Sequence, residues 1–273
     1  MDAYFKYKNI QIHYSIKGKG TAIVLLHGFL ENLSMWDEMV QTLSKTNKVV
    51  CVDLLGHGLS ENLGYVHTME EQATMVKAVL NHLRLRRYYL VGHSMGGYVG
   101  LSFTKQFPKN IKGLCLMNST ALADTKEKKI NRNRAIKAVQ QNHKTFVRIA
   151  IPMLFSEGNR IVFTNEIKKV TQEALKTTPQ GIIAALEGMK NREDNTAILH
   201  KSPFPIQMII GKQDPALDYE SLINQTKETN VEVVEFPDGH MSHFENKSEL
   251  IQSLQSFVKK SKFKTYPSLN KSS

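Results

Sequence analysis

The sequence predicts an α/β protein with a mostly parallel central sheet, helices on both faces of that sheet, and an inserted helical cap. In the first half of the 273-residue chain, short apolar strand-like runs alternate with amphipathic helical stretches, the pattern of a parallel sheet covered on both faces. Over residues 121–200 this alternation stops and only helical stretches follow, before strand patterns return. We therefore expect a core domain of residues 1–120 and 201–261 that is interrupted by a helical cap of residues 121–200.

The expected strands are short runs rich in β-branched and aliphatic residues. An edge hairpin is expected first, and central strands follow it, because such continuous apolar runs are typical of strands buried on both faces. The hairpin strands are 4–8 and 11–17, and the later strands are 22–26, 49–52, 88–91, 113–117, 205–210 and 231–236.

The expected helices show apolar residues at helical spacing. In the core they are residues 34–45, 69–84, 95–107 and 247–259, and in the cap they are residues 126–140, 144–155, 165–177 and 180–190. Residues 262–273 are basic and polar and cannot bury much apolar area, so they are expected to form a flexible tail.

Composition points to an ordinary folded protein, since 41% of residues are hydrophobic and 22% are charged. The N-terminus shows no secretion signal, and every apolar run is too short to span a bilayer. Cys51 and Cys115 lie in strand-like runs, which favours reduced thiols and a cytoplasmic location. The net charge is +11, but Lys and Arg are scattered, so the expected partner is a small-molecule substrate and not nucleic acid. The sequence leaves the oligomeric state open.

The segment Gly92-His93-Ser94-Met95-Gly96 follows the expected strand 88–91 and opens the expected helix 95–107. In this context a G-x-S-x-G pattern indicates a sharp strand-to-helix turn that exposes a serine. Side chains at Gly92 and Gly96 would clash with neighbouring backbone, which accounts for the small residues there. The pattern predicts Ser94 as a nucleophile.

A serine hydroxyl is a poor nucleophile unless a base takes its proton and a third group orients that base. After this kind of turn the expected chain order is Ser, Asp, His. Asp214 comes shortly after the expected strand 205–210, and His240 after 231–236, so both lie past strand carboxyl ends, where α/β sheets place their sites. We predict His240 as the general base and Asp214 as the acid that orients it.

In these motifs and in its order of strands and helices, the chain resembles the α/β-hydrolase fold superfamily over nearly its whole length. Residues 27–29 (His-Gly-Phe) are similar to the oxyanion loop of that family, and residues 53–60 (DLLGHGLS) to its D-x-x-G-x-G-x-S turn. The resemblance implies that the backbone N–H groups of Phe29 and Met95 form an oxyanion hole. The loop at residues 27–29 lacks the extra glycines of the HGGG type of oxyanion loop. In this respect it resembles the loops of many small-molecule esterases and cofactor-free hydrolases. Ser94 argues against the related haloalkane dehalogenases and epoxide hydrolases, which use Asp at that position.

Other histidines near these motifs have structural interpretations. His27 and His57 precede glycines in turns, where a side chain usually bonds loop backbone. His93 is expected to support the turn at the nucleophile. His243 falls in the opening turn of the last helical stretch, where a solvated or capping role is normal, so His240 is preferred as the base.

Among the carboxylates, Asp53 ends a strand and is expected to brace its turn. Asp124 is a rival to Asp214, because it follows the strand 113–117, a place from which some superfamily members supply their acid. Asp218 is a weaker rival, since it lies further from the strand end. Asp214 has the best local context of the three.

Three apolar cap residues, Met153, Phe155 and Met189, are expected to line a substrate pocket. Cys and His clusters with metal-ligand spacing are absent from the sequence, and so are glycine-rich phosphate loops. The sequence therefore predicts neither a metal nor a cofactor.

The leading interpretation is hydrolysis of small or medium acyl esters through an acyl-enzyme, as in a carboxylesterase. The same triad could instead serve C–C bond hydrolysis, perhydrolysis, thioester hydrolysis, or an elimination like that of the menaquinone-pathway synthase that resembles this family. A ligand receptor that retains the hydrolase fold and turns over slowly is an alternative from another class. Specificity resides in cap and loop geometry, so the sequence leaves the substrate open.

Overall fold

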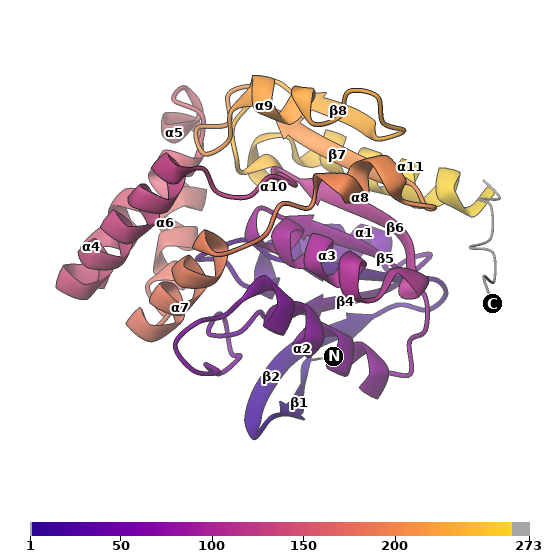
Figure 1. The fold of residues 1–273 in the computed structure, drawn as a ribbon, viewed down its shortest axis with the longest axis horizontal. Helices are drawn as coiled ribbons and strands as arrows, with labels where there is room; N and C mark the ends of the chain where they lie inside the picture. The colour runs from indigo at the N-terminus through magenta and orange to yellow at the C-terminus, as the bar shows by residue number, and fades with distance from the viewer. Residues whose placement is uncertain (1, 264–273) are drawn as a thin grey trace.

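A computed structural model describes residues 2–263, and an eight-stranded sheet forms its centre (Figure 1). The strands lie in the order β1-β2-β4-β3-β5-β6-β7-β8. They are β1 (Asp2–Tyr7), β2 (Ile10–Lys17), β3 (Ala22–Leu26), β4 (Lys48–Val52), β5 (Tyr88–His93), β6 (Ile111–Met117), β7 (Ile206–Gly211) and β8 (Glu232–Phe236). β2 pairs antiparallel with β1 and β4, and the remaining neighbours pair in parallel. The predicted α/β fold with an edge hairpin is confirmed.

Helices cover both faces of the sheet. One face packs against α2 (Met69–His82) and α3 (Met95–Gln106), and the other against α1 (Asp37–Leu43) and α11 (Lys247–Phe263). Alternate residues of β3 supply the two cores, since Val24 faces the first and Leu25 the second. This two-sided burial is why the central strands are continuously apolar.

The segment between β6 and β7 contains helices and no strand, and it forms the predicted cap region. Figure 1 shows α4, α5, α6 and α7 grouped together beyond one end of the sheet. The helices of this segment are α4 (Lys126–Ala150), α5 (Asn159–Val162), α6 (Thr164–Ala174), α7 (Pro179–Lys190) and α8 (Thr196–Lys201). Two shorter core helices, α9 (Tyr219–Asn224) and α10 (Ser242–Glu245), follow β7 and β8. Both lie just after strands whose carboxyl ends face the cap.

The first cap helix differs from the expectation of separate helices at 126–140 and 144–155. α4 covers the first stretch and continues through the second as far as Ala150, with a non-helical residue at Asn142 (φ −160°, ψ 91°). The expected end at residue 155 is wrong, because a 3₁₀ turn occupies Pro152–Leu154. The Asn142 Oδ1 accepts the Thr145 N–H at 3.0 Å, which caps the second half of the helix. The expected break is therefore a kink and not a loop.

The last helix, α11, continues to Phe263, beyond the expected core boundary at residue 261. The remainder of the predicted tail, residues 264–273, lies outside the described residues.

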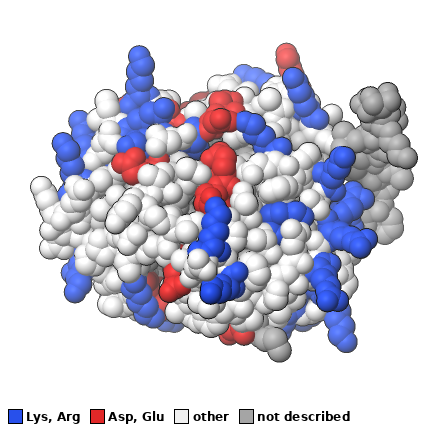
Figure 2. Space-filling view, turned by 60° about the horizontal axis from the view of Figure 1, so that its bottom comes forward, with Lys and Arg blue, Asp and Glu red and all other residues white. Residues whose placement is uncertain are grey.

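On the face shown in Figure 2, Lys and Arg side chains are dispersed, with acidic side chains between them. Within residues 2–263, every helix is too short or too polar to cross a bilayer. Cys51 and Cys115 are buried free thiols in the core beneath α1 and α11, where they pack as small apolar groups.

Candidate active site

Ser94 lies in a strained turn between β5 and α3. Its backbone angles are φ 49° and ψ −114°, a conformation that residues other than glycine rarely adopt. Its N–H donates to the Met117 carbonyl oxygen at 2.9 Å, which holds the turn against β6. A Cβ atom at Gly92 would overlap the Gly96 carbonyl oxygen, and one at Gly96 would overlap the carbonyl oxygen of Leu26. The expectation that both glycines are needed for close backbone approach is correct.

Asp214 and His240 meet at the carboxyl ends of β7 and β8, and His240 lines the same cavity as Ser94. The Asp214 Oδ2 is 2.7 Å from the His240 Nδ1, and its Oδ1 accepts the N–H groups of Ala216 (2.9 Å) and Leu217 (3.1 Å). Burial favours the neutral acid, but attraction to His240 and these hydrogen bonds outweigh burial and lower the pKa of Asp214. An ionised Asp214 accepts the Nδ1 proton, so the Nε2 atom of His240 is left as a proton acceptor.

Sequence reasoning missed Asn118, which donates a hydrogen bond to Asp214. Its side-chain NH₂ donates to the Asp214 Oδ2 (3.2 Å) and to the Gly239 carbonyl oxygen (3.1 Å). Its Oδ1 accepts the Ser242 hydroxyl at 2.7 Å. Asn118 comes directly after β6 and adopts a positive φ of 44°. The signal in the sequence was a polar residue at the carboxyl end of a strand. Its hydrogen-bond partners lie more than 90 residues away in the chain, so the sequence around Asn118 does not reveal them.

The two predicted oxyanion-hole donors come from different segments, because Met95 directly follows Ser94 and Phe29 follows β3. Met95 is the first residue of α3, so its N–H has no partner within the helix. Phe29 lies in the loop after β3, and its side chain lines the cavity with Ser94. Among the hydrogen bonds of residues 2–263, neither amide donates to a protein acceptor. Both N–H groups therefore have no protein acceptor within the described residues.

The rival carboxylates are engaged elsewhere. The Asp124 Oδ2 accepts from the Arg132 Nε at 2.7 Å, and its Oδ1 from the Arg192 Nη1 at 2.6 Å. Asp53 braces its turn as expected, by accepting backbone N–H groups from two loops. Asp218 caps α9. Of the four candidates, Asp214 is the one that contacts His240.

His27 and His57 hold loop backbone, as expected. The His27 Nε2 accepts the Leu54 N–H at 2.9 Å, which leaves its Nδ1–H to donate to the Gly28 carbonyl oxygen at 2.8 Å. The His57 Nδ1 donates to the carbonyl oxygen of Leu55 at 3.1 Å. Burial lowers the pKa of both imidazoles, that of His57 to about 3, so both rings are neutral.

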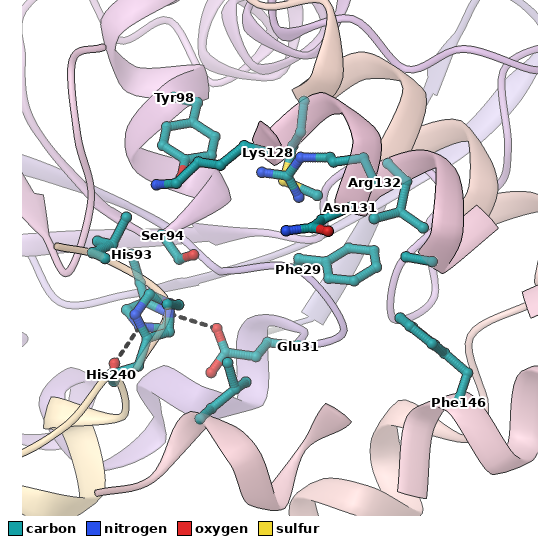
Figure 3. Close-up of a pocket in the computed structure, with 16 residues that line it drawn as sticks. Phe29, Glu31, His93, Ser94, Tyr98, Lys128, Asn131, Arg132, Phe146 and His240 are labelled. Atoms are coloured by element: carbon teal, nitrogen blue, oxygen red, sulfur yellow. Dashed lines mark hydrogen bonds and ion pairs between the residues drawn. The ribbon is translucent and has the colours of Figure 1, made fainter. Parts of the chain in front are cut away.

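His93, the residue before the nucleophile, connects a buried carboxylate to the loop that carries His240 (Figure 3). Its Nδ1 is 2.7 Å from the Glu31 Oε2, and its Nε2 donates to the His240 carbonyl oxygen at 2.9 Å. Because a carbonyl oxygen only accepts, a second proton must lie between Nδ1 and the carboxylate. Glu31 also accepts the Gly28 N–H at 2.8 Å. Glu31 and His93 together therefore connect the loop after β3, the turn at Ser94 and the loop that carries His240. Sequence reasoning missed Glu31.

His243 was expected in a solvated or capping position, and this expectation is wrong. α10 places it in the interior, 3% exposed, with its ring 5.4 Å from that of His93 and its Nε2 3.5 Å from the Glu31 Oε1. Burial lowers the pKa of His243 to about 3, so it is neutral. Glu31, His93 and His243 offer atoms within 4.8 Å of one another that could ligate a metal. Both nitrogens of His93 already contact protein oxygens, so the contacts present are those of a hydrogen-bonded network.

We expect Glu31→Gln to lower the free energy of unfolding by about 3 kcal/mol near pH 6, because it leaves His93 buried without its counter-charge. Burial favours a neutral Glu31, but the charge and hydrogen bond of His93 outweigh it and lower the pKa from 4.5 to about 2. Ionised Glu31 therefore stabilises the fold above pH 4.5, and this contribution is lost as the pH falls toward about 2. Burial disfavours the charged form of His93 as well, but the charge and hydrogen bond of Glu31 outweigh burial and raise the pKa of His93 above 6.5. The stabilisation by protonated His93 is therefore fully present below pH 6.5 and is lost as the pH rises through the raised pKa.

Urea unfolding at several pH values measures this difference. The loss in the free energy of unfolding caused by Glu31→Gln should be largest between pH 4.5 and 6.5, and it should shrink as the pH falls toward about 2 and at high pH. The matched control is Glu38→Gln, because Glu38 pairs with Lys247 at 2.7 Å on the surface, and its loss should cost about 0.5 kcal/mol or less. A difference that is independent of pH would contradict the assignment of the ion pair.

A cavity of about 370 Å³ joins the core site to the cap. Its wall combines residues of the site loops with apolar and polar residues of the cap. The apolar cap residues are Ala135, Phe146, Leu154, Leu186 and Met189, and the polar ones are Lys128, Asn131 and Arg132. The size fits a small ligand.

Of the three predicted pocket residues, Met189 lines the cavity, whereas Met153 and Phe155 do not. Met153 is 51% exposed on the surface. Phe155 is buried in a separate cluster with Ile167 and Met241. The 3₁₀ turn at Pro152–Leu154 is the reason, because it directs Leu154 and not its neighbours into the cavity.

The chain belongs to the α/β-hydrolase fold family, whose sequence model matches residues 21–247. Its relatives include hydrolases of carboxylic esters, in agreement with the predicted enzyme class. A thermophilic esterase from Thermogutta terrifontis superposes with a TM-score of 0.87 at 27% identity, covering 96% of this chain and 99% of the esterase.

Two curated relatives share the same level of identity. A monoacylglycerol lipase of Xenopus laevis is 27% identical over 85% of this chain and 74% of the lipase. The dihydrolipoyllysine-residue acetyltransferase component of an acetoin cleaving system from Pseudomonas putida is also 27% identical, over 88% of this chain. The match spans 64% of the length of that component.

Proposed function

We propose that this protein is a serine hydrolase of small or medium acyl esters, with Ser94 as nucleophile, His240 as general base and Asp214 as the orienting acid. The observation that carries the proposal is the 2.7 Å contact between the Asp214 Oδ2 and the Nδ1 of His240, a residue that lines one cavity together with Ser94. An esterase and a lipase among the relatives support ester chemistry. The buried free thiols Cys51 and Cys115 support a reducing, cytoplasmic setting.

The chemistry follows from the hydrogen-bond pattern. The Nε2 atom of His240 takes the Ser94 proton as the Oγ attacks the ester carbonyl, and Asp214 stabilises the imidazolium that forms. The free N–H groups of Phe29 and Met95 bind the oxyanion, and the helix N-terminus at Met95 adds positive potential. His240 then gives its proton to the leaving alcohol. Water next attacks the acyl-enzyme while His240 takes a proton from it, and His240 returns this proton to the Ser94 Oγ as the carboxylic acid leaves.

The test is to treat the protein with a fluorophosphonate probe and to measure hydrolysis of p-nitrophenyl esters of graded acyl length. Stoichiometric labelling at Ser94 together with turnover is the expected result. Labelling without turnover of any ester favours a hydrolase-fold receptor. Faster turnover of a matched thioester or β-diketone than of the ester would assign the triad to thioester or C–C bond hydrolysis.

We also propose that the cap sets the acyl length. Phe146→Ala should raise the ratio of kcat/KM for an octanoate ester over a butyrate ester by about tenfold, because each additional buried CH₂ group is worth about 0.8 kcal/mol. Met153→Ala is the matched control, since Met153 is a cap residue that lies outside the cavity lining. An equal ratio in both variants would show that the cap wall does not select acyl length.

A further inference from the structure

One face of α4 places positive charge in the wall of the cavity. Lys128, Asn131, Arg132 and Ala135 follow helical spacing and all line it. Figure 3 shows the side chains of Lys128, Asn131 and Arg132 entering the cavity together, with Ser94 below them. The rest of the cap wall is apolar, so these polar groups form a distinct subsite, which we call the α4 subsite.

The donors of the α4 subsite have free capacity. Within the described residues the Lys128 ammonium has no hydrogen-bond or ion-pair partner, although the residue is half-buried. Arg132 contacts Asp124 through Nε alone, which leaves its terminal NH₂ groups to the cavity. The Asn131 Oδ1 accepts from Arg134 at 3.1 Å, so its NH₂ group remains as a donor.

The nearby carboxylates do not neutralise this subsite. Asp124 is shared between Arg132 and Arg192, so one arginine charge there is uncompensated. Glu31, the acidic residue in the cavity lining, is paired with His93. Lys128 adds a further positive charge. A partly enclosed wall with surplus positive charge and free N–H donors is the chemistry that binds a carboxylate.

We propose that the substrate carries a carboxylate remote from the reacting ester carbonyl, and that Lys128, Arg132 and Asn131 bind it. This inference rests on the proposed ester hydrolysis at Ser94 and names its substrate class as half-esters or lactones of dicarboxylic acids. Lys128 sets the preference for charge. Arg132 is less suitable for substitution, because it also holds the buried Asp124.

The experiment compares methyl hydrogen adipate, which carries one carboxylate, with neutral dimethyl adipate. Lys128→Ala should lower the ratio of kcat/KM for the half-ester over the diester by about tenfold, Lys128→Glu should lower it further, and Lys128→Arg should keep it within about threefold of wild type. Raising the salt concentration to about 0.5 M should reduce the wild-type ratio. Lys129→Ala is the matched control, because Lys129 is the next residue of α4, is exposed and lies outside the cavity lining.

An unchanged ratio, within about twofold, in both Lys128→Ala and Lys128→Glu overturns the carboxylate subsite and leaves ester hydrolysis intact. If neither ester is hydrolysed, the proposed function is contradicted instead. The subsite is then tested by calorimetric binding of adipate, which Lys128→Ala should weaken by about tenfold. Equal adipate binding by wild type and variant overturns it.

Discussion

Ser94→Ala should lower kcat for ester hydrolysis by about 10⁴-fold or more, because in the proposed mechanism the Oγ atom forms the acyl-enzyme. The fold should remain intact. The turn is held by the Ser94 backbone N–H to Met117 and by the glycines on either side, and none of these contacts involves the hydroxyl. Fluorophosphonate labelling should disappear together with turnover.

The measurement is kcat with a short p-nitrophenyl ester, with circular dichroism and thermal unfolding to show that the variant is folded. The matched control is Ser102→Ala. Ser102 lies on the same helix, and its buried hydroxyl contacts Glu70 at 3.4 Å, away from the cavity, so activity should stay near that of wild type. A folded Ser94→Ala protein with more than about a tenth of wild-type activity would mean that another group is the nucleophile.

Asp214→Asn should lower kcat by about 10⁴-fold with little change in the fold. The ionised Asp214 makes His240 carry its proton on Nδ1. An amide NH₂ group at this position would donate to Nδ1 and shift the proton to Nε2, so the imidazole could no longer take the Ser94 proton. The expected loss therefore falls on kcat and not on substrate binding.

Asp218→Asn is the matched control for that substitution. Asp218 accepts the Ser221 N–H as the N-cap of α9, and asparagine caps a helix equally well, so both activity and stability should be retained. If Asp214→Asn kept most of its activity while the pH profile was unchanged, the acid would have to be sought elsewhere. Asp124 would be a poor substitute, because two arginines hold it.

The sequence by itself determined the class of fold and the places where site residues gather. Strands such as β3 are apolar at every position because both faces are buried, and this can be read without coordinates. The turn at Ser94 could also be predicted, since a Cβ atom at Gly92 would clash with the backbone of Gly96, which is four residues further along the chain. Asp214 and His240 were placed at strand carboxyl ends by the order of strands along the chain.

Only the tertiary structure decided which side chains complete the site. Glu31 and Asn118 act on groups 62 and 96 residues away, and their sequence surroundings are those of ordinary loop residues. In the cap, the Pro152–Leu154 turn decided that Leu154 faces the cavity and Met153 the solvent, a difference of one position that helical spacing could not resolve. Periodicity and turn chemistry depend on near neighbours in the chain, whereas burial and charge pairing depend on which distant segments pack together. The proposed α4 subsite also depends on such distant packing, because the local sequence around Lys128 is that of a solvated helix, whereas the fold brings this helix into the wall of the cavity that Ser94 lines.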